Sequence, residues 1–250
     1  VAGGMSGYAG ALAPDLALAG FEAQPDAIEE ALGQLVGGGF TSDGMLDELG
    51  TRWEIMRNYF RLYACSNPIH PALDCLAAAL AELRPAPEQV ERIEVATYRF
   101  ASVMRNPDPP NYFASKYSLP HAAAAMVVRG GAGFAELDDS ALADPVIAGL
   151  RRRVHISEDP AMTALAPLLR PARVTVTLID GRQATHASDS HRGDFNKPFA
   201  ESEIRGKFRE LAGTVLTETG ARDVERAVDG CEEWASVSTL TDLLRRSGRG

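Results

Sequence analysis

Cysteine is scarce in this sequence of 250 residues, and the three cysteines are not spaced for cross-linking or for metal binding. Cys65, Cys75 and Cys231 are odd in number and form no Cys-x-x-Cys pair. Neither a disulfide framework nor a zinc knuckle is therefore indicated. We expect free thiols and a reducing compartment.

Long apolar runs and long basic runs are missing as well. No stretch approaches the roughly 18 apolar residues of a membrane span, and the N-terminal residues lack the regions of a signal peptide. The net charge is −9 and the basic run 151–153 is short, which argues against a nucleic-acid or membrane partner. These absences predict a cytoplasmic protein.

The sequence does contain strong helical periodicity at both ends. The predicted helices cover 8–19, 25–36, 201–216 and 225–244. Two of them carry apolar stripes, formed by Ile28, Ala31, Leu32 and Leu35 and by Trp234, Val237, Leu240 and Leu244. Exposed stripes of this kind are costly. We therefore expect a homodimer or a helical N-terminal partner that covers them.

The middle of the sequence adds strands to the helices. Alternating residues predict strands at 93–97 and 173–179, the second followed by a hairpin turn and a return strand at 183–190. Predicted helices precede and separate these strands. The fold class is therefore α+β, with an α+β domain at 58–211 between a helical segment at 1–57 and C-terminal helices at 212–250.

One polar loop, at 58–74, has the features of an anion site. Pro71 suits the first position of a helix, so the loop runs directly into a helix N-terminus, where unpaired backbone N–H groups favour an anion. Arg61 adds a permanent positive charge with a geometry suited to a carboxylate. A substrate that carries carboxylates follows from this combination.

The same loop resembles a family signature. Its pattern, Arg61-x-Tyr63-x-Cys65-x4-His70-Pro-Ala-x-Asp74, is similar to the Lys-x-Tyr-Pro-Cys-Cys-x3-His-Pro-x-x-Asp motif of MmgE/PrpD proteins. A second segment, Ser115-Lys-Tyr-Ser-Leu-Pro-His121, is similar to the family's Ala-Lys-Phe-Ser-Leu-Pro-Tyr segment. Distal landmarks follow in the family's order, at 174–181, 193–194 and 207–211.

The resemblance also covers the start of the sequence. The segment 4–21 looks like a family stretch that normally follows a long helical N-terminal half, and the sequence opens without Met. We therefore expect that this half is missing here. The resemblance implies an MmgE/PrpD-like α/β lid domain flanked by helices of an incomplete all-helical domain.

The function that the resemblance implies is that of a cofactor-independent lyase. Such an enzyme dehydrates or decarboxylates a di- or tricarboxylate, for example 2-methylcitrate or cis-aconitate, by removing a proton next to a carboxylate. Two alternatives stay open: an epimerase of amino-dicarboxylates, and a non-catalytic remnant or subunit of a split enzyme. The second alternative is favoured by Arg61 and Met5, which occupy positions where we align family lysines.

Five residues are candidates for the site. His121 and Arg61 are the catalytic candidates, His121 as a group that exchanges protons near neutral pH and Arg61 as a carboxylate clamp, because arginine is a poor proton acceptor. Arg61, Tyr63, Ser66 and Lys116 are the candidates for substrate binding. We expect Arg61, Ser66 and His121 to meet in one cleft.

Metal binding is the alternative function for two groups of polar residues. His70 and Asp74 share a helix face, but no third ligand is evident, so we interpret both as structural, with His70 bonded to loop carbonyls. The group His186, Asp189, His191 and Asp194 is interpreted as an exposed polar loop rather than a metal site. We therefore predict no metal site, and the family resemblance implies that no cofactor is needed.

Overall fold

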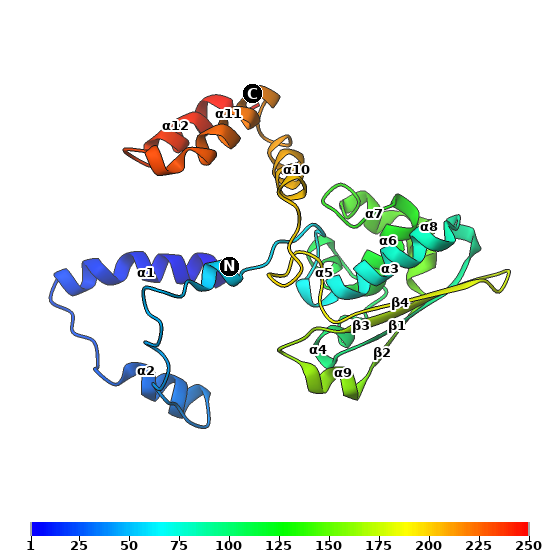
Figure 1. Ribbon diagram of the computed structural model, residues 1–250, viewed down its shortest axis with the longest axis horizontal. Coiled ribbons are helices and arrows are strands. Elements are labelled where there is room, and N and C mark those ends of the chain that lie inside the picture. Colours follow the sequence, from blue (N-terminus) through cyan, green and yellow to red (C-terminus); the bar gives the residue numbers. More distant parts are fainter. Residues whose placement is uncertain (1, 250) are drawn as a thin grey trace. The chain divides into compact units, whose positions relative to one another are not determined.

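The computed structural model describes residues 2–249, and the chain divides into two compact units, Val1–Trp53 and Glu54–Gly250. Each unit is described by itself (Figure 1). Along residues 2–249, no helix has both the length and the apolar character that crossing a membrane would require.

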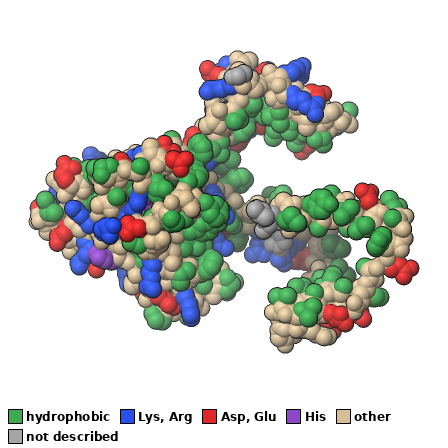
Figure 2. All heavy atoms as spheres, turned by 180° about the vertical axis from the view of Figure 1, so that it is seen from behind, with side chains coloured by type: hydrophobic (Ala, Val, Ile, Leu, Met, Phe, Trp, Pro, Cys, Tyr) green, Lys and Arg blue, Asp and Glu red, His purple; other side chains and the backbone are tan. Residues whose placement is uncertain are grey.

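The first unit is helical, as the sequence predicts. α1 (Ala2–Leu18) is followed by the short α2 (Ala27–Glu29), which continues as a π-helix at Glu30–Val36. None of its described side chains is buried, and Ile28 and Leu35 are 57% and 83% exposed. Figure 2 shows hydrophobic side chains along the surface of this unit. The apolar stripe is therefore not covered by neighbouring residues of its own unit.

The second unit is built around a mixed sheet of four strands. β1 (Val90–Thr97) lies between β2 (Val154–Glu158), which is parallel to it, and β3 (Ala172–Leu178), which is antiparallel. β4 (Gln183–Ser188) pairs antiparallel to β3 through a tight turn in which Gly181 has a φ of +87°. The strands and the hairpin predicted from residue alternation are confirmed.

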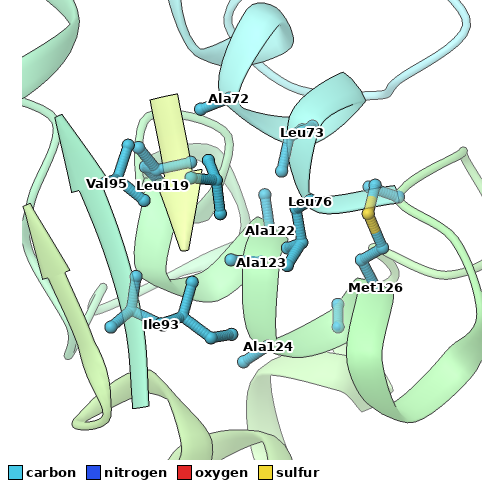
Figure 3. Close-up of a cluster of buried hydrophobic side chains, with 14 of the residues drawn as sticks. Ala72, Leu73, Leu76, Ile93, Val95, Leu119, Ala122, Ala123, Ala124 and Met126 are labelled. Atoms are coloured by element: carbon cyan, nitrogen blue, oxygen red, sulfur yellow. The ribbon is translucent and has the colours of Figure 1, made fainter. Parts of the chain in front are cut away.

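Three helices share a core with this sheet. They are α3 (His70–Leu83), α6 (Leu119–Arg129) and α8 (Pro145–Arg151). α3 packs on β3 and β4. α6 packs on α3, α8 and β2, and its small alanines allow this close packing. Figure 3 shows the resulting core, formed by Ala72, Leu73, Leu76, Ile93, Val95, Leu119, Ala122, Ala123, Ala124 and Met126.

Short helices fill the connections between these elements. The α-helices among them are α4 (Arg99–Ser102), α5 (Tyr112–Ser115), α7 (Asp139–Ala143) and α9 (Pro160–Leu165). Single turns of 3-10 helix lie at Glu54–Arg57, Asn67–Ile69 and Pro87–Gln89. Asp144 and Asp159 cap α8 and α9 by accepting hydrogen bonds from N–H groups of the first turn.

The C-terminal helices differ from the prediction. α10 (Glu201–Ala212) matches, but the single helix expected at 225–244 is wrong, because the chain forms α11 (Glu218–Asp229) and α12 (Ser238–Ser247). Gly230 ends α11, and a 3-10 turn at Cys231–Glu233 reverses the chain so that α12 packs against α11. Leu240 is consequently half-buried within this unit, whereas Val237 and Leu244 of the same predicted stripe are exposed.

Candidate functional site

A cavity of about 1330 Å³ lies within the second unit, where the loop before α3 meets the loop before α6. Its wall consists of aromatic rings, small polar groups and five cations. The residues that line it are Tyr59, Arg61, Tyr63, Ala64, Cys65, Ser66, Asn67, Pro68, Tyr98, Arg99, Phe100, Val103, Tyr112, Phe113, Lys116, Tyr117, Phe134, Thr163, Ala166, Pro167, Arg170, Lys207 and Leu211.

Backbone hydrogen bonds hold the two motif loops together at this cavity. The Ser66 N–H donates to the Lys116 carbonyl at 2.8 Å, so the loop of the first motif is bonded to that of the second. The Phe60 N–H donates to the Gly193 carbonyl at 2.9 Å. Gly193 has a φ of +90°, and a Cβ there would lie 2.6 Å from the Phe60 oxygen. Only glycine fits this close approach.

The charge of the wall is of one sign. Its cations are Arg61, Arg99, Lys116, Arg170 and Lys207, and the lining contains no Asp, Glu or His. The chain as a whole carries a net charge of −9, so this excess of positive charge is local. A concave surface of this sign attracts anions.

Three of these cations donate to neutral groups. Arg61 Nη2 donates to the Tyr59 hydroxyl at 2.7 Å, and Arg170 Nη1 donates to Asn67 Oδ1 at 2.5 Å. Both guanidinium groups lie over the Tyr59 ring, 5.2 Å and 5.6 Å from its centroid. Lys116 Nζ donates to the Leu137 carbonyl at 3.1 Å. Within residues 2–249, none of the three forms an ion pair with a carboxylate.

Two acidic groups of the wall, the Tyr63 hydroxyl and the Cys65 thiol, are uncharged at neutral pH. Burial, followed by the adjacent Asp74 carboxylate, raises the pKa of Tyr63, whose hydroxyl donates to Asp74 Oδ1 at 2.8 Å. Burial raises the pKa of the Cys65 thiol to about 12. Neither group is ready to accept a proton. The described wall therefore suits a negatively charged group, and neither Tyr63 nor Cys65 is placed to act as a general base at neutral pH.

His70 lies behind the wall rather than in it. Its Nε2 donates to the Cys65 carbonyl at 3.1 Å, which is the kind of loop contact expected for this residue. Burial lowers the pKa of His70 to about 3, so the ring is neutral. Asp74 Oδ2 accepts from the Arg192 N–H at 2.7 Å. Within residues 2–249, no group of three or more His, Cys, Asp or Glu residues is placed to hold a metal ion.

His121 does not reach the cavity, so the prediction that it meets Arg61 and Ser66 there is wrong. It lies in the first turn of α6, fully buried, and neither ring nitrogen has a hydrogen-bond partner. Burial lowers its pKa to about 4, with further lowering by Arg151 and Lys116. The first turn of a helix that is buried on every side can point a side chain inward, and sequence spacing does not reveal the direction. Arg61, Tyr63, Ser66 and Lys116 do line the cavity.

The segment interpreted as an exposed polar loop is only partly exposed. His186 pairs with Glu82, with 2.9 Å between Nε2 and Oε2. His191, by contrast, is fully buried, and its Nε2 lies 3.0 Å from Asn67 Nδ2. The exposure expected of His191 is therefore wrong, because its partner comes from a loop 124 residues earlier in the sequence.

Sequence reasoning missed several residues of the wall. Asn67 lies inside the first motif and carries a polar side chain, so its position was a usable signal. Lys207 lies in a segment recognised as a family landmark, although no role followed from that. Arg99 is the first residue of α4 and Arg170 follows α9, and nothing local in the sequence distinguishes them from surface arginines.

Comparisons with known proteins agree with this geometry. Residues 63–233 match the family model of the MmgE/PrpD C-terminal domain. A cis-aconitate decarboxylase of Aspergillus terreus is 24% identical over 265 residues, covering 96% of this chain and 53% of that protein. The cis-aconitate decarboxylase of Mus musculus is 25% identical over 189 residues, covering 72% and 38%. The chain spans about half the length of the Aspergillus relative.

Proposed function

Because this chain belongs to the MmgE/PrpD family, we propose that it forms the carboxylate-binding side of a lyase site. The substrate is a di- or tricarboxylate such as cis-aconitate or 2-methylcitrate, and the reaction is a decarboxylation or dehydration that needs no cofactor. The relatives that are cis-aconitate decarboxylases support the decarboxylase form of this proposal.

One observation carries the proposal: five cations and no carboxylate line a cavity in a chain with an excess of acidic residues. Among the described residues, the charged groups of Arg61, Lys116 and Arg170 contact neutral oxygens and aromatic rings and no carboxylate. A substrate carboxylate would supply the missing negative charge and accept charge-assisted hydrogen bonds. Because several cations line the cavity, it can bind a substrate that carries two or three carboxylates.

The same cations suit the chemistry. When a proton leaves the carbon next to a carboxylate, negative charge moves onto the carboxylate oxygens. Fixed positive groups that already face those oxygens stabilise this charge without having to reorganise. Arg61 keeps its proton at all relevant pH values, so its role is to hold the carboxylate and not to act as the base.

The base comes from outside the described wall in this proposal. The lining contains no His, Asp or Glu, and Cys65 and Tyr63 hold their protons at neutral pH. In this proposal Lys116 and Lys207 act as cations that bind the substrate. A partner surface placed over the cavity would supply the missing group. This assigns binding and charge stabilisation to this chain and proton transfer to the partner.

The rim of the cavity supports such a partner. Phe100, Val103 and Phe113 line the cavity and are exposed, Phe113 by 72%. Exposed apolar side chains around a binding site mark an interaction surface. We assign this surface to a helical segment, on the same polypeptide or on a partner, because the Aspergillus relative is about twice as long as the region that it shares with this chain. A second copy of this chain is the other outcome of the test.

Nuclear magnetic resonance in deuterated water tests the reaction. The full chain, alone and together with a separately produced helical half, is incubated with cis-aconitate, 2-methylcitrate and an amino-dicarboxylate, and deuterium exchange and products are followed. We expect the chain alone to bind cis-aconitate or 2-methylcitrate without exchange, and we expect exchange or product once the helical half is present, reduced by Arg170→Met and unchanged by Arg205→Met. Binding without exchange even with the helical half would favour the non-catalytic subunit, inversion of the amino-dicarboxylate would favour the epimerase, and neither binding nor exchange under either condition would contradict the proposal.

A further inference from the structure

We propose that His191 is a positioning residue, which holds Asn67 in one orientation and through it directs Arg170 into the cavity. The three side chains form a chain of hydrogen bonds from the buried interior to the wall. His191 itself does not line the cavity. The inference rests on the proposed function in that Arg170 is taken to bind a substrate carboxylate.

The first step is the orientation of the Asn67 amide. A guanidinium group can only donate, so the atom of Asn67 that lies 2.5 Å from Arg170 Nη1 must be the carbonyl oxygen. The amide nitrogen then faces His191, 3.0 Å from Nε2. Because an amide nitrogen can only donate, His191 Nε2 must accept.

The second step is the protonation of His191. A ring nitrogen that accepts a hydrogen bond carries no proton, so the proton of the neutral ring lies on Nδ1. Nδ1 lies 4.0 Å from Asp194 Oδ2 and has no closer partner within the described residues. The contact with Arg170 therefore identifies the orientation of the Asn67 amide, and that orientation identifies the tautomer of His191.

The surroundings of His191 keep the ring in place. Its ring packs edge-on against the rings of Tyr59 and His70, with centroids 5.4 Å and 5.7 Å away. Tyr59 is also the ring over which both Arg61 and Arg170 lie. A movement of His191 would therefore disturb both the amide and the ring that support the arginines.

Protonation would break this arrangement. A second proton, on Nε2, would face the Asn67 amide donor and force the amide to turn, and its nitrogen would then face Arg170. Burial, followed by the positive charges of Arg170, Arg61 and Lys197, lowers the pKa of His191, against the opposing effect of Asp194. His70, the titratable ring in edge contact with it, is neutral as well. Carboxylate binding should therefore weaken at acid pH.

The tautomer can be measured without any ligand. Long-range nitrogen–proton correlation spectra of the full chain distinguish a protonated from an unprotonated ring nitrogen, and the spectrum of His191→Gln assigns the signal. We expect a protonated Nδ1 and an unprotonated Nε2 at pH 7. A protonated Nε2 would overturn the inference even if cis-aconitate binds, whereas failure of cis-aconitate to bind would count only against the proposed function.

Two substitutions then test the effect on Arg170. His191→Phe keeps a flat ring but removes the acceptor, and we expect the Kd for cis-aconitate to rise about tenfold, which corresponds to about 1.4 kcal/mol. His191→Gln can present an oxygen to Asn67 and should restore most of the affinity while abolishing the change in affinity between pH 7 and pH 5. Unchanged affinity in His191→Phe would overturn the inference. If that variant does not fold, a Gln variant that folds but keeps the pH dependence would overturn it as well.

Discussion

In the cavity, Arg61 and Arg170 donate to the neutral oxygens of Tyr59 and Asn67. Between α10 and α11, Arg205 instead contacts three carboxylates, those of Glu201, Glu225 and Asp229, and Arg209 shares Glu225. The residue type is the same in both places. The difference lies in what opposes the charge.

This difference separates a binding arginine from a structural one. Arg205 has its charge neutralised by the fold, so an added anion would meet repulsion from three acids. The cavity arginines are held in place by hydrogen bonds and by the Tyr59 ring while their charge stays available. Whether an arginine is available for anion binding therefore depends on the groups that already contact it, and not on how many arginines lie nearby.

Removing Arg170 should have the largest effect on binding. Arg170→Met keeps much of the apolar stem but deletes the charge. We expect the Kd for cis-aconitate to rise about 10- to 100-fold, which corresponds to the typical free energy of a hydrogen bond to a charged group. Isothermal titration calorimetry measures this. Arg205→Met is the matched control and should bind as wild type. Equal losses in both variants would remove the distinction between the two regions.

Lys116 should contribute less than Arg170, because an ammonium group is a point charge that does not match a carboxylate with two parallel bonds. We expect Lys116→Met to raise the Kd about tenfold or less, and Lys116→Arg to retain binding. The same titration distinguishes them. A Lys116→Met variant with wild-type affinity would restrict the binding site to the arginine side of the cavity.

Acid should destabilise the core around α6, which contains His121, before it affects the ion pairs of α10 and α11. Burial lowers the pKa of His121 to about 4 from an ordinary value of 6.5, so the unfolded chain takes up the proton first. The free energy of unfolding is unaffected by His121 titration above pH 6.5. As the pH falls from 6.5 towards 4, it decreases by up to about 1.4 kcal/mol per pH unit. The pKa of Glu225 is lowered from 4.5 by hydrogen bonds from Arg209 and Arg205, so its charge is lost at lower pH than that of an ordinary glutamate.

Thermal denaturation of His121→Leu measures this effect. The substitution removes two ring nitrogens that have no partner, so the variant should gain Tm over wild type at pH 5 more than at pH 7.5. A gain that is equal at both pH values would show that His121 has the same pKa in the folded and unfolded chain, and would contradict the lowered pKa. Hydrogen exchange on α10 and α11 should change little between these pH values.

Arg205→Met should have the smallest effect, and on stability alone. Exposed ion pairs contribute little, and salt screens them. We expect a slightly lower Tm at low salt that approaches the wild-type value at high salt. A large loss of Tm that persists at high salt would show that this arginine holds α10 to α11 by packing rather than by charge.

Much of the fold was predictable from local patterns. The alternation at 173–179 and the turn at Asp180 and Gly181 specified the hairpin, because side-chain period and turn chemistry are both local. The break between α11 and α12 was missed, because Trp234 continues an apolar period across it while the chain in fact reverses at Gly230.

The site was predictable only where its residues share a motif. Arg61, Ser66 and Lys116 come from two motif loops, and the bond between the Ser66 N–H and the Lys116 carbonyl joins them. Arg170 meets Asn67 from 103 residues away, and His191 meets it from 124 residues away, so sequence spacing carries no signal for either contact. His121 failed for a related reason, since the tertiary packing of α6 decides which way it points.

Calorimetric titration of the full chain with cis-aconitate and with its trimethyl ester tests the central claim most directly. The account predicts that cis-aconitate binds at about 20 mM salt and more weakly at about 300 mM, where charges are screened over a much shorter distance. The ester has the same carbon skeleton without the charges and should not bind. No binding of cis-aconitate at low salt, or equal affinity for acid and ester, would contradict the assignment of this cavity as a carboxylate site.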